Sequence, residues 1–278
     1  MAPQRVFIKN QGDRLFIREK SPCHGRYKTM FNDPEGKQLL VEASPNYFDA
    51  GPETVEQIRI LLPDAHIVIL LRDPIDKFHA QFCYQQKATI FPQSLTVDGY
   101  VEQLLSEGQS VEDIAIQSLP WRDRNQLLCG LHYQGIEHWF TRFSRQQISG
   151  IFFEDFIADP RATLLSLLSR HSLSMEPYAK RTFEIQNDTW GYKNARVHTL
   201  ARTAHRRWEP FFRRHYRLKT QLRRVYRRWN GTLPNSTMAP DTVGRLRSLY
   251  SDDMNRTRDF LVNVGYTDAP NWLSSKYD

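Results

Sequence analysis

An arginine at the end of a short apolar run is the first feature that could do chemistry. Residues 65–71 are apolar apart from one histidine and lead directly into Arg72, Asp73 and Pro74. Such a run predicts a strand covered on both faces, and the proline predicts the first turn of a helix. A guanidinium at the strand's carboxyl end and the unpaired N–H groups of the next helix would both favour a dianion. The plainer interpretation is a helix cap with a surface arginine.

Positive charge is concentrated in one segment of the chain. The net charge is +7, yet residues 196–228 alone hold twelve Lys or Arg and one acid, Glu209. Such a field attracts polyanions, which include nucleic acid, anionic lipid, acidic glycan and nucleotides. Apolar residues recur at roughly helical spacing between the arginines, which predicts an amphipathic helix or a pair of helices. A solvated helix face explains the same pattern without any partner.

The sequence lacks the motifs of several enzyme classes. The sequence has no Gly-x-Ser-x-Gly elbow, no His-Glu-x-x-His helix and no Gly-x-Gly-x-x-Gly turn, so hydrolase, zincin and dinucleotide-dehydrogenase functions are not indicated. Kinase-like phosphate-loop chemistry is not indicated either. Cys23, Cys83 and Cys129 are widely spaced and predict neither a disulfide framework nor a metal site.

Strand and helix signals alternate along the first two thirds of the chain. Strands are expected at 38–43, 65–71 and 148–153, and helices at 52–62, 101–105, 127–143, from Pro160, and at 243–262. This order predicts the α/β class, with a parallel β-sheet flanked by helices and a helical C-terminal part. We expect a single domain over 1–278, with its α/β core at 25–172 and a mainly helical part at 200–262. Ligands should gather at the carboxyl ends of the strands, near Arg72.

Four blocks in one order, spread over residues 25–272, carry a family pattern. They are residues 41–48, with Ser44 and Pro45; residues 70–82, around Arg72; residues 132–160, with Trp139; and residues 187–196, with Gly191. Together they resemble the PAPS-dependent sulfotransferases, above all the glycan-modifying and bacterial branches. The resemblance implies a P-loop-like sulfotransferase fold, PAPS as co-substrate, PAP as product and no metal.

The resemblance also assigns site residues. Arg72 would hold the nucleotide 3′-phosphate, with added charge from Lys77. Ala80 occupies the family's serine position and cannot donate a hydroxyl hydrogen bond, so a charge-assisted bond of about 1.5–3 kcal/mol is missing. The segment with Tyr192, Lys193 and Arg196 resembles a loop that closes over the nucleotide. An exposed loop that binds no ligand is the alternative.

The first block corresponds to the acceptor side of the family's site. Three of its residues are assigned to acceptor binding: Glu42, Ser44 and Tyr47. For the general base, Glu19 and His24 have suitable chemistry, although an ordinary surface role fits both.

The family's N-terminal strand and its Lys-x-Gly-Thr-Thr-like loop for the 5′-phosphosulfate are not found in the sequence. One explanation is that the recorded sequence begins after the true N-terminus and has lost a membrane anchor or signal with the loop. The other is a degenerate paralogue that binds nucleotide or glycan without transferring sulfate, to which Ala80 lends weight.

The leading hypothesis is an enzyme that moves a sulfuryl group from PAPS to a hydroxyl or amine of a carbohydrate. The alternative is a non-catalytic binder of nucleotide or anionic glycan. Under either hypothesis, the basic Arg202–Arg228 helix is a candidate docking surface for a polyanion. No nucleic-acid partner is expected, because no recognised motif accompanies the arginines. Sequons at Asn187, Asn230, Asn235 and Asn255 suit a Golgi lumen if an upstream anchor is assumed; as written, the chain is soluble or cytoplasmic.

Overall fold

The computed structural model describes residues 43, 47–105, 114, 118–171, 173, 176, 182–183, 191–232, 237–266 and 270–273. The chain forms two compact units, and each is described by itself. Unit 1 comprises residues 1–72, 131–183 and 252–278, and unit 2 comprises residues 73–130 and 184–251. The single sulfotransferase-like domain over 1–278 stays a prediction.

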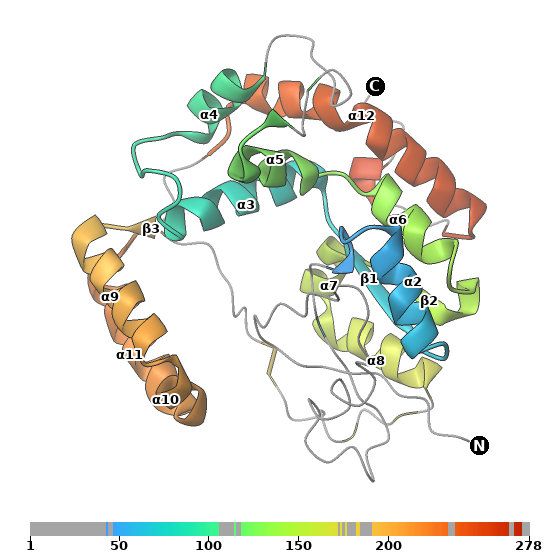
Figure 1. Cartoon of the computed structure of the whole chain (residues 1–278), viewed down its shortest axis with the longest axis horizontal. Helices are drawn as coiled ribbons and strands as arrows, with labels where there is room; N and C mark the ends of the chain where they lie inside the picture. Colours follow the sequence, from blue (N-terminus) through green and yellow to red (C-terminus); the bar gives the residue numbers. More distant parts are fainter. Residues whose placement is uncertain are drawn as a thin grey trace. The chain divides into compact units, whose positions relative to one another are not determined.

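Unit 1 is built around two parallel strands (Figure 1). Strand β1 pairs with β2 in the register Ile67 to Ile148 through Leu71 to Phe152. The described elements of unit 1 are α2 (Pro52–Leu61), β1 (Ile67–Leu71), α6 (Tyr133–Phe140), the 3-10 turn Arg145–Gln147, β2 (Ile148–Phe152), α7 (Phe153–Ala158), α8 (Pro160–Arg170), the second half of α12 (Pro240–Asn263) and the 3-10 turn Asn271–Leu273. The predicted parallel α/β arrangement is confirmed here, and α2, β1, β2 and α8 lie close to their predicted bounds.

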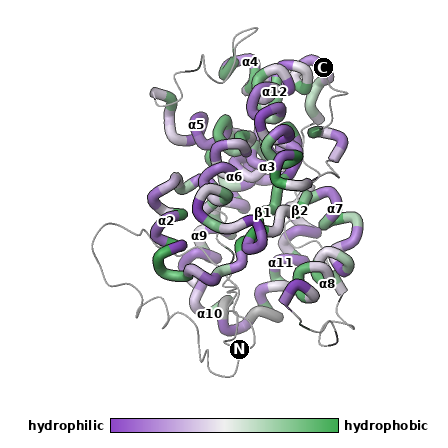
Figure 2. The backbone as a smooth tube through the Cα atoms, turned by 90° about the vertical axis from the view of Figure 1, so that its right-hand side faces the viewer, coloured by the Kyte–Doolittle hydropathy of each residue, from purple (hydrophilic) through white to green (hydrophobic). Residues whose placement is uncertain are grey.

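Strand β1 is less enclosed than its composition predicts. All five of its residues are apolar, which Figure 2 shows as a hydrophobic stretch. Ile69 and Leu71 are buried, whereas Val68 and Leu70 are 44% and 51% exposed. Successive side chains of a strand point to opposite faces, so only one face of β1 packs on the core. The prediction of a strand covered on both faces is therefore wrong for β1.

The core of unit 1 lies on that buried face. It joins β1 and β2 to α2, α6, α12 and the C-terminal turn through eleven buried side chains: Val55, Ile69, Leu71, Ile136, Trp139, Phe143, Ile148, Phe152, Leu261, Trp272 and Leu273. The apolar positions predicted for the 52–62 helix are partly represented there by Val55, with Ile58 packed against the cluster. Residues more than two hundred positions apart thus share one apolar cluster.

The N-terminus of α6 is capped by a distant acid. No side chain of its own first turn does so. Instead, the Asp253 carboxylate on α12 accepts hydrogen bonds from the backbone N–H groups of His132, at 2.7 Å, and Tyr133, at 3.2 Å. Burial raises the pKa of Asp253, while the bonds from His132 and Tyr133 act in the opposite direction. The first N–H groups of a helix otherwise lack partners, so Asp253 fixes where α6 begins against α12.

Unit 2 is mainly helical. Its described elements are α3 (Pro74–Lys87), α4 (Val97–Leu104), α5 (Trp121–Leu128), β3 (Gly191–Tyr192), α9 (Ala195–Arg207), α10 (Glu209–Arg214), α11 (Tyr216–Asn230), β4 (Gly231–Thr232) and the first half of α12. Strands β3 and β4 form a two-residue antiparallel pair. Helix α3 is fixed to α5 by buried amides, since Gln126 donates to the Phe78 carbonyl at 2.6 Å and Gln85 donates to Gln126 at 2.8 Å. Helical structure after residue 200 is confirmed, but it consists of three helices, α9 to α11, and not of one or two. The segment from Arg202 to Arg228 is therefore not a single helix.

One helix is predicted wrongly. The helix expected at 127–143 is interrupted between α5 and α6. Gly130 lies there against the ring of Tyr250, whose hydroxyl donates to the Leu127 carbonyl at 2.9 Å, and a Cβ at Gly130 would overlap that ring. Glu154 and Asp155 lie in the first turn of α7.

Replacing Asp253 with alanine should lower the free energy of unfolding by about 1–3 kcal/mol, because two N–H groups of α6 lose their acceptor. Asp252, its exposed neighbour on α12, supplies the matched control. Urea unfolding followed by circular dichroism measures both variants. Equal losses for Asp253→Ala and Asp252→Ala would show that the cap contributes nothing of its own.

Candidate functional site

Arg72 lies at the carboxyl edge of the parallel pair, as the sequence predicts. It follows the last residue of β1, and its guanidinium carbon lies 4.6 Å from the ring centroid of Phe153. Phe153 is the first residue after β2, so the two strands deliver the cation and the ring to the same edge. A guanidinium over an aromatic face gains about 0.5–2 kcal/mol and loses freedom of movement. Arg72 is half-buried, not a plain surface arginine.

His132 holds the backbone of Arg72. Its Nε2 lies 2.7 Å from the Arg72 carbonyl oxygen, and because a carbonyl only accepts, Nε2 carries the proton. The imidazole is 1% exposed and makes edge contacts with Phe48 and Trp272, at 6.4 Å and 5.9 Å between ring centroids. His132 thus connects the cap on Asp253 to the carbonyl of Arg72. The sequence offered no signal for this role, because the two residues are sixty positions apart.

The first turn of α3 is already capped. One carboxylate oxygen of Asp73 accepts from the backbone N–H groups of Ile75, at 2.8 Å, and Asp76, at 3.3 Å. The Lys77 N–H bonds to the Asp73 carbonyl at 2.8 Å. The prediction that this helix end presents unpaired N–H groups to an anion is therefore wrong, and Asp73 adds negative charge there. Helix capping is the interpretation that holds for Asp73.

The other residues assigned on α3 lie within its first two turns. Lys77 and Ala80 are both half-buried. Ala80 brings only a methyl group to its position, so the missing hydroxyl bond predicted from the sequence has no substitute from its own side chain.

Tyr192, Lys193 and Arg196 lie near the opposite end of α3. Tyr192 is buried and stacks on His198, with centroids 4.1 Å apart and planes inclined by 10°. The Nε2 of His198 lies 2.8 Å from the carbonyl of Lys87, the last residue of α3 and about 20 Å along the helix from Pro74. Lys193 and Arg196 are exposed. The structure groups these residues with the last turn of α3, and it gives one face of the Tyr192 ring to His198.

Four further assignments, Glu19, His24, Glu42 and Ser44, lie outside the described residues and stay predictions. Tyr47 is described, half-buried and packed against the core of unit 1. Much of the predicted site therefore depends on Arg72.

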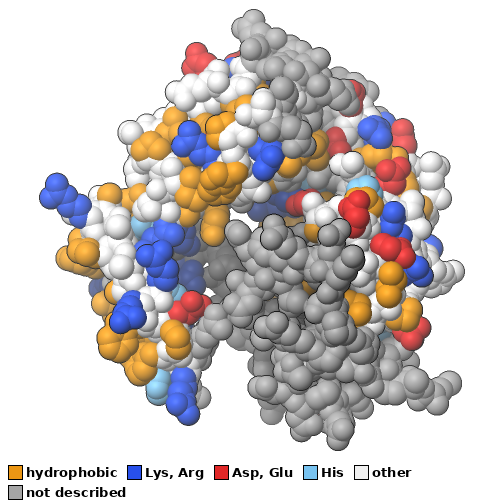
Figure 3. All heavy atoms as spheres, in the orientation of Figure 1, with side chains coloured by type: hydrophobic (Ala, Val, Ile, Leu, Met, Phe, Trp, Pro, Cys, Tyr) orange, Lys and Arg blue, Asp and Glu red, His pale blue; other side chains and the backbone are white. Residues whose placement is uncertain are grey.

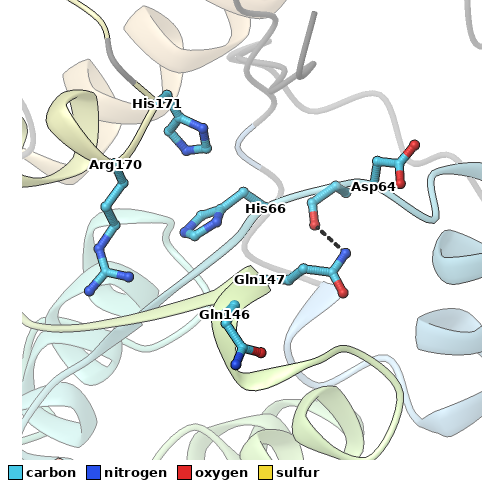
Figure 4. Close-up of a pocket in the computed structure, with 7 residues that line it drawn as sticks. Asp64, His66, Gln146, Gln147, Arg170 and His171 are labelled. Carbon is cyan, nitrogen blue, oxygen red and sulfur yellow. Dashed lines mark hydrogen bonds between the residues drawn. The ribbon is translucent and has the colours of Figure 1, made fainter. Parts of the chain in front are cut away.

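A pocket of about 270 Å³ lies at the other edge of the strands, where β1 and β2 begin (Figure 4). Its lining consists of Asp64, Ala65, His66, Gln146, Gln147, Arg170 and His171. His66 Nε2 lies 2.8 Å from the Ser149 hydroxyl, and the His66 and His171 rings meet edge to face at 4.8 Å. Burial, followed by the nearby His171 and Arg170, lowers the pKa of His66 to about 4. This imidazole is neutral at physiological pH.

The described residues include neither a candidate metal centre nor a candidate membrane span. In that part of the chain, no three His, Cys, Asp or Glu side chains gather in a way that could hold a metal ion. None of the described helices has both the length and the apolar composition needed to cross a bilayer.

The fold and Arg72 define an α/β protein with a cation at the carboxyl edge of its parallel strands. A family model described as "Sulfotransferase family" matches residues 7–177, which is more than half of the chain. The chain belongs to the sulfotransferase family, whose general chemistry is sulfuryl transfer. No curated protein matches the chain.

The chain is similar in fold to one solved structure. The sulfotransferase from Alicyclobacillus acidocaldarius is similar over 90% of this chain and 74% of its own, with 18% identity and a TM-score of 0.55. The sulfotransferase domain from the curacin biosynthetic pathway is 12% identical over 59% of this chain and 50% of its own, with a TM-score of 0.39. At 18% identity, the first likeness supports the α/β sulfotransferase fold and nothing finer.

The stability of the protein should fall as the pH drops from about 6.5 to 4. An unfolded histidine titrates near 6.5 and the folded His66 near 4, so in this window the unfolded state binds more protons. The contribution is complete above about pH 6.5 and amounts to roughly 1–2 kcal/mol, since His66 is only half-buried and solvent screens part of it. His66→Gln keeps a polar partner for Ser149 and should reduce this slope in urea unfolding. Part of the slope should remain, because burial also lowers the pKa values of His171, His198 and His205.

Gln146→Ala is the control, because it alters the same pocket without removing an ionisable group, and it should leave the slope unchanged. A slope as steep in His66→Gln as in the unaltered protein would assign the pH dependence to other groups.

Proposed function

We propose that this chain transfers a sulfuryl group from PAPS to a hydroxyl or amine of a carbohydrate acceptor. Family membership supports the transfer, and the placement of Arg72 at the carboxyl edge of β1 and β2 is the observation that carries the donor assignment. The carbohydrate acceptor follows from the resemblance to the glycan-modifying branch. Such an acceptor would suit a Golgi lumen. Of the four sequons, Asn230 is 3% exposed and its side-chain amide donates to the Asn194 carbonyl at 3.2 Å, so it is not open to glycosylation in the folded chain.

The reaction is an in-line displacement at sulfur. The acceptor oxygen or nitrogen forms a bond to sulfur while the bond from sulfur to the 5′-phosphate oxygen breaks, and PAP leaves with the electron pair. A general base takes the proton from the acceptor, and Glu19 and His24 are the candidates. No electrons are exchanged with a redox partner.

Arg72 would bind the 3′-phosphate of the donor. Phe153 and His132 hold its side chain and its carbonyl, so little freedom is lost when a phosphate binds. A guanidinium can bond two phosphate oxygens at once through charge-assisted hydrogen bonds. Because Asp73 occupies the N–H groups of Ile75 and Asp76, affinity for the dianion must come from side-chain cations and not from the helix end. Lys77 is the further cation assigned at this end of α3. Lys193 and Arg196, which the resemblance also assigns to the nucleotide, lie near the last turn of α3, about 20 Å along the helix, and would not share the same phosphate.

Arg72→Ala should weaken PAP binding at least tenfold and lower sulfate transfer in proportion, because a charge-assisted pair of about 1.5–3 kcal/mol is lost. Radiolabelled sulfate transfer from PAPS to a panel of glycans and calorimetric titration with PAP are the two measurements. Arg59→Ala is the control, since Arg59 is an exposed arginine paired with Glu56 on α2 at 2.6 Å. Unchanged PAP affinity in Arg72→Ala would remove Arg72 from the donor site.

Ala80→Ser should strengthen PAP binding at least about tenfold, because it restores the hydroxyl that the family places at this position. Ala88→Ser, at the C-cap of the same helix, should have no effect on PAP affinity. If both variants bind PAP as the unaltered protein does, the correspondence of Ala80 with the family's serine fails.

A non-catalytic sulfotransferase-like binder is the second candidate. Two observations favour it: the methyl group of Ala80 and the carboxylate of Asp73 on the first turn of α3 both weaken the donor site. This candidate predicts that PAP or heparin binds, that Arg72→Ala abolishes PAP binding, and that no glycan in the panel receives sulfate. Transfer to any one glycan would exclude it.

A further inference from the structure

Helices α9, α10 and α11 form a helical hairpin within unit 2. Near its base, Nδ1 of His198 on α9 lies 2.7 Å from the hydroxyl of Tyr226 on α11. Near its tip, the ring of His205 stacks on that of Phe212, with centroids 5.5 Å apart. Burial lowers the pKa of His205, and the nearby charge of Lys219 on α11 lowers it further. The start of α9 thus lies beside the end of α11, and the end of α9 lies beside the start of α11. The two helices therefore run antiparallel.

An apolar stripe runs along α11 and is left in water. Leu218, Leu222, Val225 and Trp229 follow one another at intervals of four, three and four residues, which places them on one helix face. They are 40%, 48%, 68% and 68% exposed. We call these four residues the α11 stripe.

The α11 stripe is not the face that packs on α9. That contact uses Tyr226 and Asn230, and Asn230 donates to the Asn194 carbonyl at 3.2 Å and accepts from its N–H at 2.9 Å. Further exposed apolar side chains lie elsewhere on the hairpin, namely Leu200, Trp208 and Phe211. The hairpin therefore presents more apolar surface than its own packing uses.

Arginines accompany the stripe. Arg223, Arg224, Arg227 and Arg228 are all exposed on α11, and Figure 3 shows basic and hydrophobic side chains intermixed over α9–α11. Glu209 is the single acid between residues 196 and 228. A second copy of this surface would be repelled by like charge. A glycan or nucleic acid would satisfy the arginines and leave the stripe in water.

We propose that this hairpin docks on the surface of an anionic lipid bilayer. The α11 stripe would enter the boundary between headgroups and acyl chains, and the arginines beside it would contact lipid phosphates. Exposed Leu, Val and Trp on one face with Arg and Lys on the rest, at low overall hydrophobicity, is the pattern of a helix that lies in the membrane interface and does not cross it. Trp229 suits that boundary because its ring is apolar and its N–H is polar. The proposal does not depend on sulfuryl transfer.

Co-sedimentation of the full chain with vesicles tests the proposal. The unaltered protein should bind phosphatidylcholine vesicles that contain phosphatidylserine at least about tenfold more tightly than pure phosphatidylcholine vesicles. Arg224→Gln with Arg228→Gln should lower this affinity by about fivefold per arginine, which is roughly 25-fold for the pair. Leu222→Ser with Trp229→Ser should lower it at least about tenfold while every charge is kept.

Trp121→Ser is the matched control, because Trp121 on α5 is 62% exposed, close to the 68% of Trp229, and lies away from the hairpin. Its vesicle affinity should equal that of the unaltered protein, and circular dichroism should show the same helix content in every variant. Trp229→Phe keeps the stripe apolar, so vesicle binding should persist while quenching of fluorescence by brominated lipid falls.

Three results would overturn the proposal. The first is equal binding to both kinds of vesicle or to neither. The second is vesicle binding that survives Leu222→Ser with Trp229→Ser, since the stripe would then play no part. The third is binding to heparin or RNA alone, which would make the hairpin a polyanion surface only.

Discussion

The parallel register of β1 and β2 determines where charge can gather in unit 1. Because Leu71 pairs with Phe152, the residues that follow the two strands, Arg72 and Phe153, emerge at the same edge. The ring then supports the guanidinium at 4.6 Å. A register shifted by one residue would turn the side chains of one strand to the other face and separate the pair. The backbone hydrogen bonds of a five-residue ladder thus position the cation on which the proposed donor site depends.

A second dependence runs through buried polar contacts. Asp253 on α12 caps the start of α6, and His132 at that start donates to the Arg72 carbonyl. Each contact satisfies a polar group that would be costly to bury alone, so none is easily lost without the others. The three residues come from distant parts of the sequence and meet beside a core that contains Phe152 and Trp272.

Local signals predicted the elements that depend on local physics. Proline at the start of α2, α3 and α8 marked their first turns, and the apolar runs of β1 and β2 marked the strands. The four family blocks indicated the sulfotransferase family. Long-range contacts account for the errors. The ring of Tyr250 interrupts a helix more than a hundred residues earlier in the chain, and the exposure of Val68 and Leu70 depends on what packs against β1.

The candidate site was predictable only in part, for the same reason. Arg72 could be located, because a strand's carboxyl end is visible in the sequence. The sequence allowed both a helix cap at Asp73 and a helix end open to an anion, and only the structure decides for the cap. It gave no sign that Tyr192 stacks on His198. Where a side chain has two possible partners, the geometry of the fold determines which one it contacts. Residue type alone does not specify that geometry.

The Asp73 cap has a consequence for selectivity among anions. Its carboxylate is tethered one residue from the helix it caps, so it competes for those N–H groups at a high effective concentration. Free sulfate or phosphate in solution would have to displace the Asp73 carboxylate from these N–H groups and would also be repelled by its negative charge. The start of α3 is thereby shielded from the small anions of the cell, and only a ligand that gains most of its binding energy elsewhere could settle beside it.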